Sequence, residues 1–353
     1  MAEGGGVDGG GRWTVRPEGS NWGDFGADDQ LGRLNLITPE RRRAAAREVR
    51  EGIAFCLSLP LDVPRVTLNP RRFPPQLGFS MRGEDPAFNY PMAKVNPGQA
   101  DVVCDDRATL SLQYSTQWDA LCHIGCLYDA HGDGAVEATY YNGYRARADV
   151  RGPYDYVHDR TAVDGPYGAH RLGIETIAET GLQGRGIMID LQAHVGLERV
   201  AVGYDGLMRI LEADGVSVEA GDVLCFRTGF DRELLTAAAD PAHPFDHGRC
   251  AGLDGTDERL LQWVADSGAA ALVSDNDSVE LLPDMAAMTN HGPRIPLHNL
   301  CLFKLGMPLG EMFLLSDLAD WLRAHGRFRF LFTAPPLRLP GAVGSPVTGV
   351  GTV

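Results

Sequence analysis

The stretch Ser111–Gly125 carries a set of polar side chains that could do chemistry. Two carboxamides, Gln113 and Gln117, are followed by a carboxylate, Asp119, and an imidazole, His123. All four positions are odd-numbered, so in an extended chain their side chains would project from one face. A metal ion or a substrate would give such groups the partners that buried polar atoms need. The pattern therefore predicts a metal or substrate site on this segment.

Two other interpretations of the same stretch remain open from spacing alone. In the first, the segment is a half-exposed strand whose polar face is solvated, and His123 is there by chance. In the second, Cys122 and Cys126 take part in the chemistry beside His123. Neighbouring strand residues point to opposite sides, so Cys122 is poorly placed to act with His123 as a nucleophile. No second cysteine pair has the same spacing as Cys122 and Cys126, as a structural zinc site would require. A metal-activated water is the favoured chemistry.

The stretch resembles the signature of the cyclase-type metal-dependent hydrolase family, which includes bacterial kynurenine formamidases and isatin hydrolases. The family pattern is His-x3-His-x-Asp-x3-His, and Thr116, Asp119 and His123 match it. Gln113 and Gln117 stand where the first two histidines usually occur. The resemblance implies that Asp119 is a metal ligand, with Gln113 and Gln117 as its companions. It also implies that His123 is the catalytic acid/base.

The two glutamines affect which metal is expected. A glutamine offers a neutral amide oxygen, which binds zinc poorly and suits a harder ion better. We therefore expect a divalent ion as cofactor, manganese or zinc, with magnesium or calcium as further candidates. Tight stoichiometric zinc is not expected from this ligand set.

The family resemblance implies two further ligands downstream, His298 and Glu311. Family members hold a second metal with the signature aspartate and a later His and Glu at nearly the same separation, and the run Gly306-x-x-Leu-x-Glu311 resembles theirs. His291 is rejected as that ligand, because Phe303 would then stand at the glutamate position. In an alternative that stays open, His298 binds the backbone and Glu311 caps the following helix.

The resemblance covers most of residues 20–347 and implies a swivelling β/β/α fold that assembles as homodimers or homotetramers. The opening Trp-Gly segment lies near the active site in that family. We expect Trp22, Trp118 and Asn276 to contact a small-molecule substrate.

Strand-like and helix-like segments alternate along the chain, which predicts one α/β domain over residues 13–353 with a mixed sheet and flanking helices. Residues 1–12 are glycine-rich and are expected to be disordered. Residues 62–107 are rich in proline and glycine and predict a long surface excursion that adds to the pocket rim. Helices are expected over 38–51, 170–180, 204–213, 256–267 and 317–326, strands over 53–61, 108–116, 184–190, 222–229, 269–276 and 328–333, and either over 295–305.

Composition limits the classes of partner and the cellular compartments that we expect for this protein. The 353 residues carry a formal net charge of -15, and Lys and Arg do not cluster, which argues against nucleic acid or a membrane as partner. Seven cysteines with scattered spacing, no secretory signal and no membrane-length apolar run favour a reduced cytoplasmic setting.

Three functions fit these observations. The first is a metal-dependent hydrolase of a small-molecule amide, lactam or lactone, in which His123 moves the protons. The second is a metal-dependent cyclase or lyase of secondary metabolism on the same fold. The third is a metal-free binding protein on this scaffold.

Overall fold

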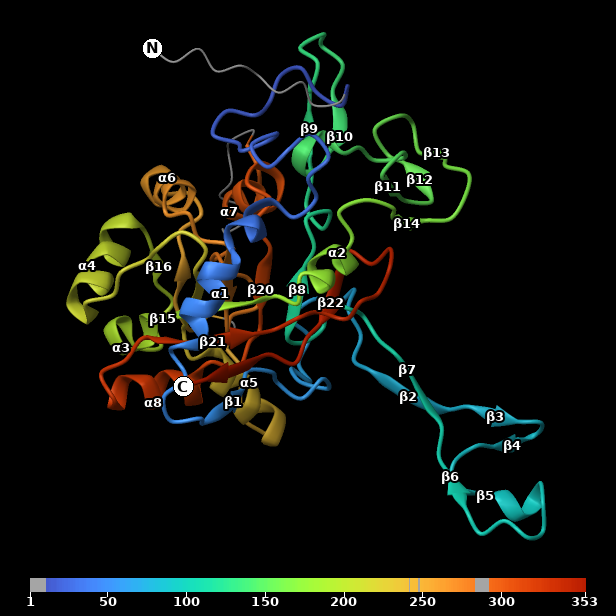
Figure 1. The fold of residues 1–353 in the computed structure, drawn as a ribbon. Helices are drawn as coiled ribbons and strands as arrows, with labels where there is room; N and C mark the ends of the chain where they lie inside the picture. The colour runs from blue at the N-terminus through green and yellow to red at the C-terminus, as the bar shows by residue number, and fades with distance from the viewer. Residues whose placement is uncertain (1–10, 241, 247, 283–291) are drawn as a thin grey trace.

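The computed structural model describes residues 11–240, 242–246, 248–282 and 292–353 (Figure 1). Within them, a nine-stranded sheet runs through the body of the molecule. In order across the sheet, its strands are β1 (Ala54–Cys56), β23 (Val350–Thr352), β21 (Arg329–Thr333), β15 (Gln183–Asp190), β17 (Val223–Arg227), β19 (Ala271–Ser274), β20 (Leu309–Glu311), β8 (Gln117–Asp119) and β22 (Gly344–Pro346).

The four central strands β15, β17, β19 and β20 run parallel, and the other neighbours pair antiparallel. β17 and β19 are buried along their whole length, as parallel strands covered on both faces must be. Their continuous apolar runs made these two strands predictable from the sequence. The predicted α/β class with a mixed sheet is confirmed.

The helices pack around this sheet (Figure 1). They are α1 (Pro39–Ala46), α2 (Ile174–Glu179), α3 (Leu191–Val195), α4 (Tyr204–Asp214), α5 (Phe230–Ala239), α6 (Glu258–Asp266), α7 (Pro296–His298) and α8 (Ser316–Ala324), with a π-helical segment at Asn299–Lys304. α1 lies against β15, and its N-cap Thr38 accepts a hydrogen bond from the N–H of Arg41, as predicted. The predicted extension of this helix to residue 51 is wrong, because turns follow Ala46.

The region expected to be a surface excursion forms an arm that projects far from the body (Figure 1). Its strands pair as β2 (Gln76–Phe79) with β7 (Asp106–Thr109), β3 (Met81–Arg82) with β4 (Asp85–Pro86), and β5 (Tyr90–Pro91) with β6 (Val102–Val103). Further two-stranded pairs are β9 (Cys126–Tyr128) with β10 (Glu137–Thr139), β11 (Val150–Arg151) with β14 (Gly168–Ala169), β12 (Tyr154–Asp155) with β13 (Thr161–Ala162), and β16 (Ala201–Val202) with β18 (Gly252–Leu253).

The strand predicted over residues 108–116 is wrong. β7 ends at Thr109, residues 112–115 form turns and bends, and the next strand, β8, begins only at Gln117. Gln113 and Gln117 therefore do not lie on one extended strand. The shared face inferred from odd numbering holds for Gln117 and Asp119 only.

The N-terminal segment is held on the body by backbone contacts. Residues 1–10 of the predicted tail lie outside the described residues, whereas Arg12 donates a hydrogen bond to Asp28 at 2.9 Å. Further along, the N–H of Arg33 donates to the carbonyl of Gly306 at 2.9 Å. A Cβ on Gly32 would collide with that same carbonyl, so the close approach requires glycine.

Two observations concern the expected compartment. None of the helices in the described part of the chain could span a membrane. All seven cysteines are free thiols. The cytoplasmic location itself stays a prediction.

Candidate active site

The site begins with the alternation of side chains along β8. Gln117 and Asp119 point to one face of the strand, and Trp118 points to the other. β20 pairs antiparallel with β8, which places Glu311 directly across from Gln117. On that face the Gln117 Nε2 donates a hydrogen bond to Glu311 Oε2 at 2.8 Å. Two strands that are distant in sequence thus bring an amide and two carboxylates together.

Asp119, His298 and Glu311 form a group that could hold a metal ion. Their ligand atoms all lie within 4.8 Å of one another, and all three residues are buried. α7 supplies His298, whose Nε2 lies 3.1 Å from Glu311 Oε1. Two carboxylate oxygens and one imidazole nitrogen are ordinary donors for manganese, zinc and similar divalent ions. The structure therefore brings together the three predicted ligands that carry ionisable side chains.

Glu280 orients His298 and was missed in the sequence. Its carboxylate accepts hydrogen bonds from His298 Nδ1 at 2.8 Å, from the His298 N–H at 2.9 Å and from the Leu297 N–H at 3.1 Å. A carboxylate on Nδ1 leaves Nε2 to face Asp119 and Glu311, which is the usual support for a metal-binding histidine. The only sequence signal was an acidic residue six positions after the end of β19.

The carboxylates also set the protonation of His298. Burial alone would lower the pKa of His298, but the hydrogen bonds to Glu280 and Glu311 outweigh it and raise the pKa to about 10. Without a metal ion, His298 is therefore an imidazolium near neutral pH. That proton must leave before Nε2 can bind a metal ion.

Two buried oxygen atoms without hydrogen-bond partners indicate whether the residues suit a cation. Asp119 Oδ1 and Gln117 Oε1 are buried, and neither has a hydrogen-bond partner among the described residues. Burial raises the pKa of Asp119 to about 6, against the opposing charge of His123. Buried acceptor oxygens without donors are costly, and a divalent cation beside them removes that cost. The donor set therefore fits the expected metal.

The two signature glutamines lie in different surroundings. Gln117 is fully buried beside Glu311, so its amide can orient that carboxylate while its oxygen faces the site. Gln113 lies in the turn before β8, and its backbone carbonyl accepts a hydrogen bond from Arg72 at 2.8 Å. Its side-chain amide packs against Gly344, although the residue lines the same pocket. The ligand role of both residues stays a prediction.

His123 stands at the edge of the metal group. Its Nε2 lies 3.8 Å from Asp119 Oδ1, and its side chain is 21% exposed. A turn holds it there, because its backbone N–H bonds to the Ala120 carbonyl at 2.8 Å. The ring can exchange protons with solvent and still reach a group bound beside Asp119.

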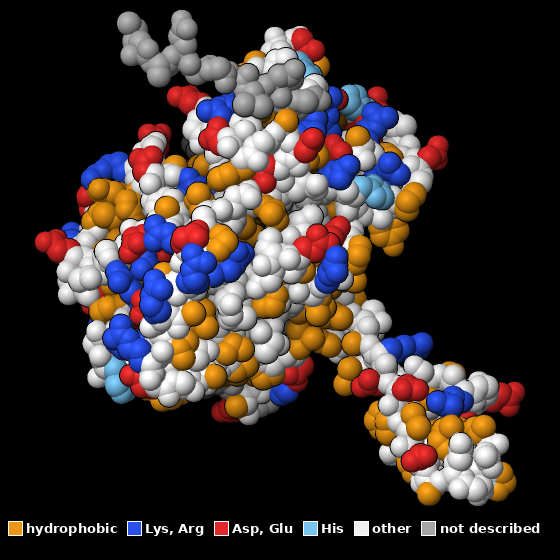
Figure 2. All heavy atoms as spheres, in the orientation of Figure 1, with side chains coloured by type: hydrophobic (Ala, Val, Ile, Leu, Met, Phe, Trp, Pro, Cys, Tyr) orange, Lys and Arg blue, Asp and Glu red, His pale blue; other side chains and the backbone are white. Residues whose placement is uncertain are grey.

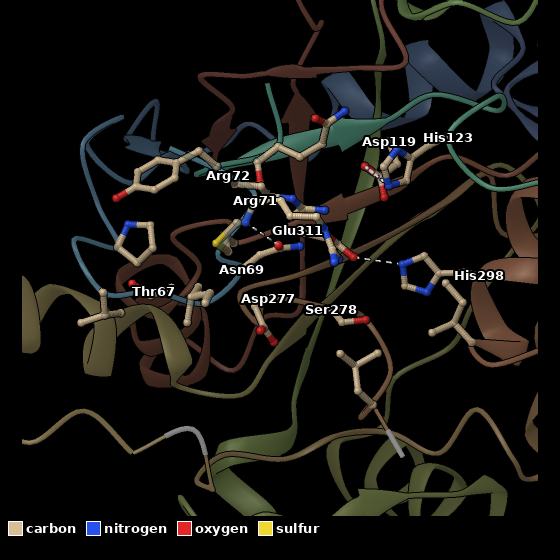
Figure 3. Close-up of a pocket in the computed structure, with 18 of the residues that line it drawn as sticks. Thr67, Asn69, Arg71, Arg72, Asp119, His123, Asp277, Ser278, His298 and Glu311 are labelled. Carbon is tan, nitrogen blue, oxygen red and sulfur yellow. Dashed lines mark hydrogen bonds and ion pairs between the residues drawn. The ribbon is translucent and has the colours of Figure 1, made fainter. Parts of the chain in front are cut away.

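The metal group and His123 open into one pocket of about 910 Å³ (Figure 3). Asp119, His123, His298 and Glu311 form one side of it. The segment 62–74, which leads into the arm, forms much of the opposite wall, as expected for a pocket rim. The sequence interpretation missed several polar residues of this lining, among them Arg71, Arg72, Asp277 and Ser278.

The three expected substrate contacts lie elsewhere. Trp22 is fully buried and donates its indole N–H to the Phe303 carbonyl at 2.8 Å. Its ring also packs edge-on against the ring of Phe303. Trp118 is fully buried on the core face of β8 and donates to the Ala334 carbonyl. Asn276 is buried and donates to the Ala251 carbonyl. None of them lines the pocket, so their predicted contact with substrate is not supported. His291 lies outside the described residues.

The thiol of Cys122, next to His123, is not activated as a nucleophile. Burial raises the pKa of Cys122 to about 12, so its thiol stays protonated at neutral pH. A cysteine nucleophile is disfavoured on this ground, whereas the argument from strand direction does not apply, because Cys122 and His123 lie in a turn.

Comparison with known proteins shows the family of this chain. The model of the Cyclase family, described as "Putative cyclase", matches residues 56–281, which is more than half of the chain. The chain belongs to the cyclase family. No curated protein matches the sequence.

Solved structures share the fold of this cyclase-family chain. A crystal structure described as a novel cyclase has 29% identity and a TM-score of 0.70, and the match covers 95% of this chain and 99% of that one. Isatin hydrolase A from Ralstonia solanacearum has 16% identity and a TM-score of 0.53, with 89% and 97% covered. An isatin hydrolase bound to the product analogue thioisatinate has 15% identity and a TM-score of 0.52, with 87% and 94% covered. The predicted cyclase-family fold is confirmed.

Proposed function

We propose that this protein is a metal-dependent hydrolase of a small-molecule amide, lactam or lactone. The observation that carries the proposal is the convergence of Asp119, His298 and Glu311 beside His123 at one pocket. The isatin hydrolases among the structural relatives are consistent with it, although their identity is low.

In this proposal, Asp119, His298 and Glu311 hold a divalent ion, and Gln117 adds its orphaned oxygen. Such an ion supplies Lewis acidity, which polarises a substrate carbonyl and lowers the pKa of water. Glu280 orients the ring of His298 through its hydrogen bond with Nδ1, on the side away from the metal group. Gln117 keeps Glu311 from turning away, since its amide nitrogen holds Glu311 Oε2.

His123 is the proposed proton carrier. Its ring lies close to Asp119 without belonging to the metal group, and it is partly exposed to the pocket. It can take a proton from the attacking water and return it to the leaving nitrogen or oxygen. A linear amide then gives a carboxylic acid and an amine, and a lactam or lactone gives one ring-opened product that carries a carboxylic acid and an amine or hydroxyl group, so all atoms of substrate and water are accounted for.

The test is hydrolysis by metal-loaded protein in water enriched in ¹⁸O, with a panel of lactams, lactones and linear amides. We expect at least one substrate to gain one labelled oxygen in its carboxyl product, only when metal is present. Turnover without labelled oxygen would instead favour the cyclase or lyase alternative. Failure of the protein to bind any divalent ion would favour the binding protein.

We also propose that the chain forms a homodimer or homotetramer through its arm. A two-stranded hairpin is marginal on its own, and among the described residues β2 and β7 pair only with each other. Apolar side chains on the arm are exposed, including Leu77 at 79% and Val95 at 62% (Figure 2). A second copy of the chain would cover them and the open strand edges.

Light scattering on purified protein tests the assembly. The chain has a mass of 38.2 kDa, and we expect a multiple of it in solution. A variant with residues 77–108 replaced by a short Gly-Ser turn should be a monomer that keeps its metal. A monomeric wild-type protein would contradict the proposal.

A further inference from the structure

The wall of the pocket opposite the metal group carries positive charge. Arg71 and Arg72 come from the segment that leads into the arm and extend toward the side where Asp119 and Glu311 lie (Figure 3). Arg72 is half-buried, and one of its nitrogens, Nη1, donates to the Gln113 carbonyl at 2.8 Å. That bond fixes the guanidinium and leaves its other donors unused by the described residues.

These arginines lack the counter-ions that other pocket residues have. Arg65, in the same wall, has a counter-ion, because its Nε lies 3.1 Å from Asp62 Oδ2. No ion pair joins Arg71 or Arg72 to a carboxylate among the described residues, and the one carboxylate whose pKa the charge of Arg72 lowers is Asp119, which the bound metal ion would neutralise. Guanidinium groups left without an anion in a pocket are poised to bind one, most favourably a planar group that accepts two parallel hydrogen bonds.

The net charge of the pocket also favours an anionic ligand. With a divalent ion bound and His298 neutral, the charges of Asp119 and Glu311 are cancelled. What remains, besides the mutually paired Arg65 and Asp62, is Arg71, Arg72 and Arg294 against the carboxylate of Asp277. The loaded pocket is therefore positive overall, and its field would attract an anionic ligand.

Part of the remaining lining is apolar. Val66, Leu68, Ile124, Ile295 and Met312 face the same space. Pockets of this kind bind an apolar body and use a few placed polar groups to fix its orientation. The ligand that suits both walls is amphipathic, with an apolar body and one anionic end.

We propose that Arg71 and Arg72 form a carboxylate-binding subsite, so that the substrate is an apolar molecule bearing a carboxylate besides the bond that is cleaved. This inference rests on the proposed function, since it names the substrate class for the same site. Arg71 and Arg72 hold the carboxylate, and the apolar wall holds the body. The scissile carbonyl is thereby directed to the side of Asp119 and His123.

The experiment compares matched acids and amides as ligands, using calorimetry on the full chain with and without manganese. The probes are acetate and acetamide, phenylacetate and phenylacetamide, and 2-naphthylacetate and 2-naphthylacetamide. We expect at least one of the larger acids to bind about 10-fold or more tightly than its amide, the size of one charge-assisted hydrogen bond. The preference should persist in metal-free protein, which separates the arginines from direct binding to the metal.

The variants Arg71→Gln and Arg72→Gln should each reduce that preference, and the double variant should abolish it. Arg65→Gln is the matched control, because Arg65 already has a counter-ion in the same wall, and it should keep the preference. Melting temperatures and manganese content should stay near wild type in all of them, which shows that the fold and the metal group are intact.

Three outcomes would overturn the inference. The first is equal binding of every acid and its amide, or no binding of either. The second is a preference that survives in the double variant. The third is a preference that appears only with manganese, since the metal would then be the anion site. None of these depends on turnover, so the proposed hydrolase activity can fail while the subsite stands, or the reverse.

Discussion

Metal binding should release a proton, because His298 must lose one to become a ligand. Its hydrogen bonds to Glu280 and Glu311 raise the pKa of His298 to about 10 despite burial. At pH 8 most of the metal-free protein would therefore carry a protonated His298. Each manganese ion bound should therefore release about one proton.

The sign of the pH dependence follows from this competition. Protons and metal compete for His298 Nε2, so the apparent affinity rises with pH, by about tenfold per unit between pH 7 and 8.5. Asp119, with a pKa raised to about 6 by burial, adds a second competing proton at lower pH. Below about pH 6 the affinity should therefore fall more steeply, by up to about a hundredfold per unit.

Calorimetry in buffers of different ionisation enthalpy counts these protons directly. The variant Glu280→Gln keeps an acceptor for His298 Nδ1 but removes the charge that holds the proton. It should release clearly fewer protons at pH 8.5, whereas Glu212→Gln, on the exposed side of α4, should match wild type. A pH-independent affinity with no proton released would refute the role of His298 as a ligand that is protonated before binding.

Three further predictions concern single residues and the metal. Glu280→Ala leaves three buried donors without a partner and should lower the free energy of unfolding by about 3 kcal/mol or more, measured by urea denaturation. His123→Asn should keep its metal while the chemical step slows by about 100-fold; normal turnover would make His123 structural, and loss of metal would make it a ligand. Competition between metals should favour manganese over tight stoichiometric zinc, because carboxylate and amide oxygens dominate the donor set, and one tightly held zinc per chain would contradict this.

Local patterns predicted much of the fold. β17 and β19 were predictable because each is mostly a continuous apolar run, and β15 because it contains the short run Ile187–Ile189. α4 and α6 were predictable because each has an amphipathic repeat. The strand expected over 108–116 failed because alternation of side chains was assumed to continue through a turn. Residues 295–305, left open between strand and helix, are helical.

The candidate site was predictable only in part. Asp119, His298 and Glu311 were inferred from a resemblance, and the fold brings them together across β8, α7 and β20. Glu280 and Arg72 could not be inferred, because their partners are distant in sequence and no local pattern marks the pairing. Trp22 and Trp118 were misassigned because a large aromatic side chain fills a core as readily as it lines a pocket.

The most direct test of the account is the position of a metal ion in crystals of the purified protein, located by anomalous scattering and checked by elemental analysis. We predict one divalent ion within about 2.5 Å of ligand atoms from Asp119, His298 and Glu311, and none in the Asp119→Ala variant. A fully occupied ion in Asp119→Ala, or an ion bound elsewhere with these three side chains hydrogen-bonded only to one another, would contradict it.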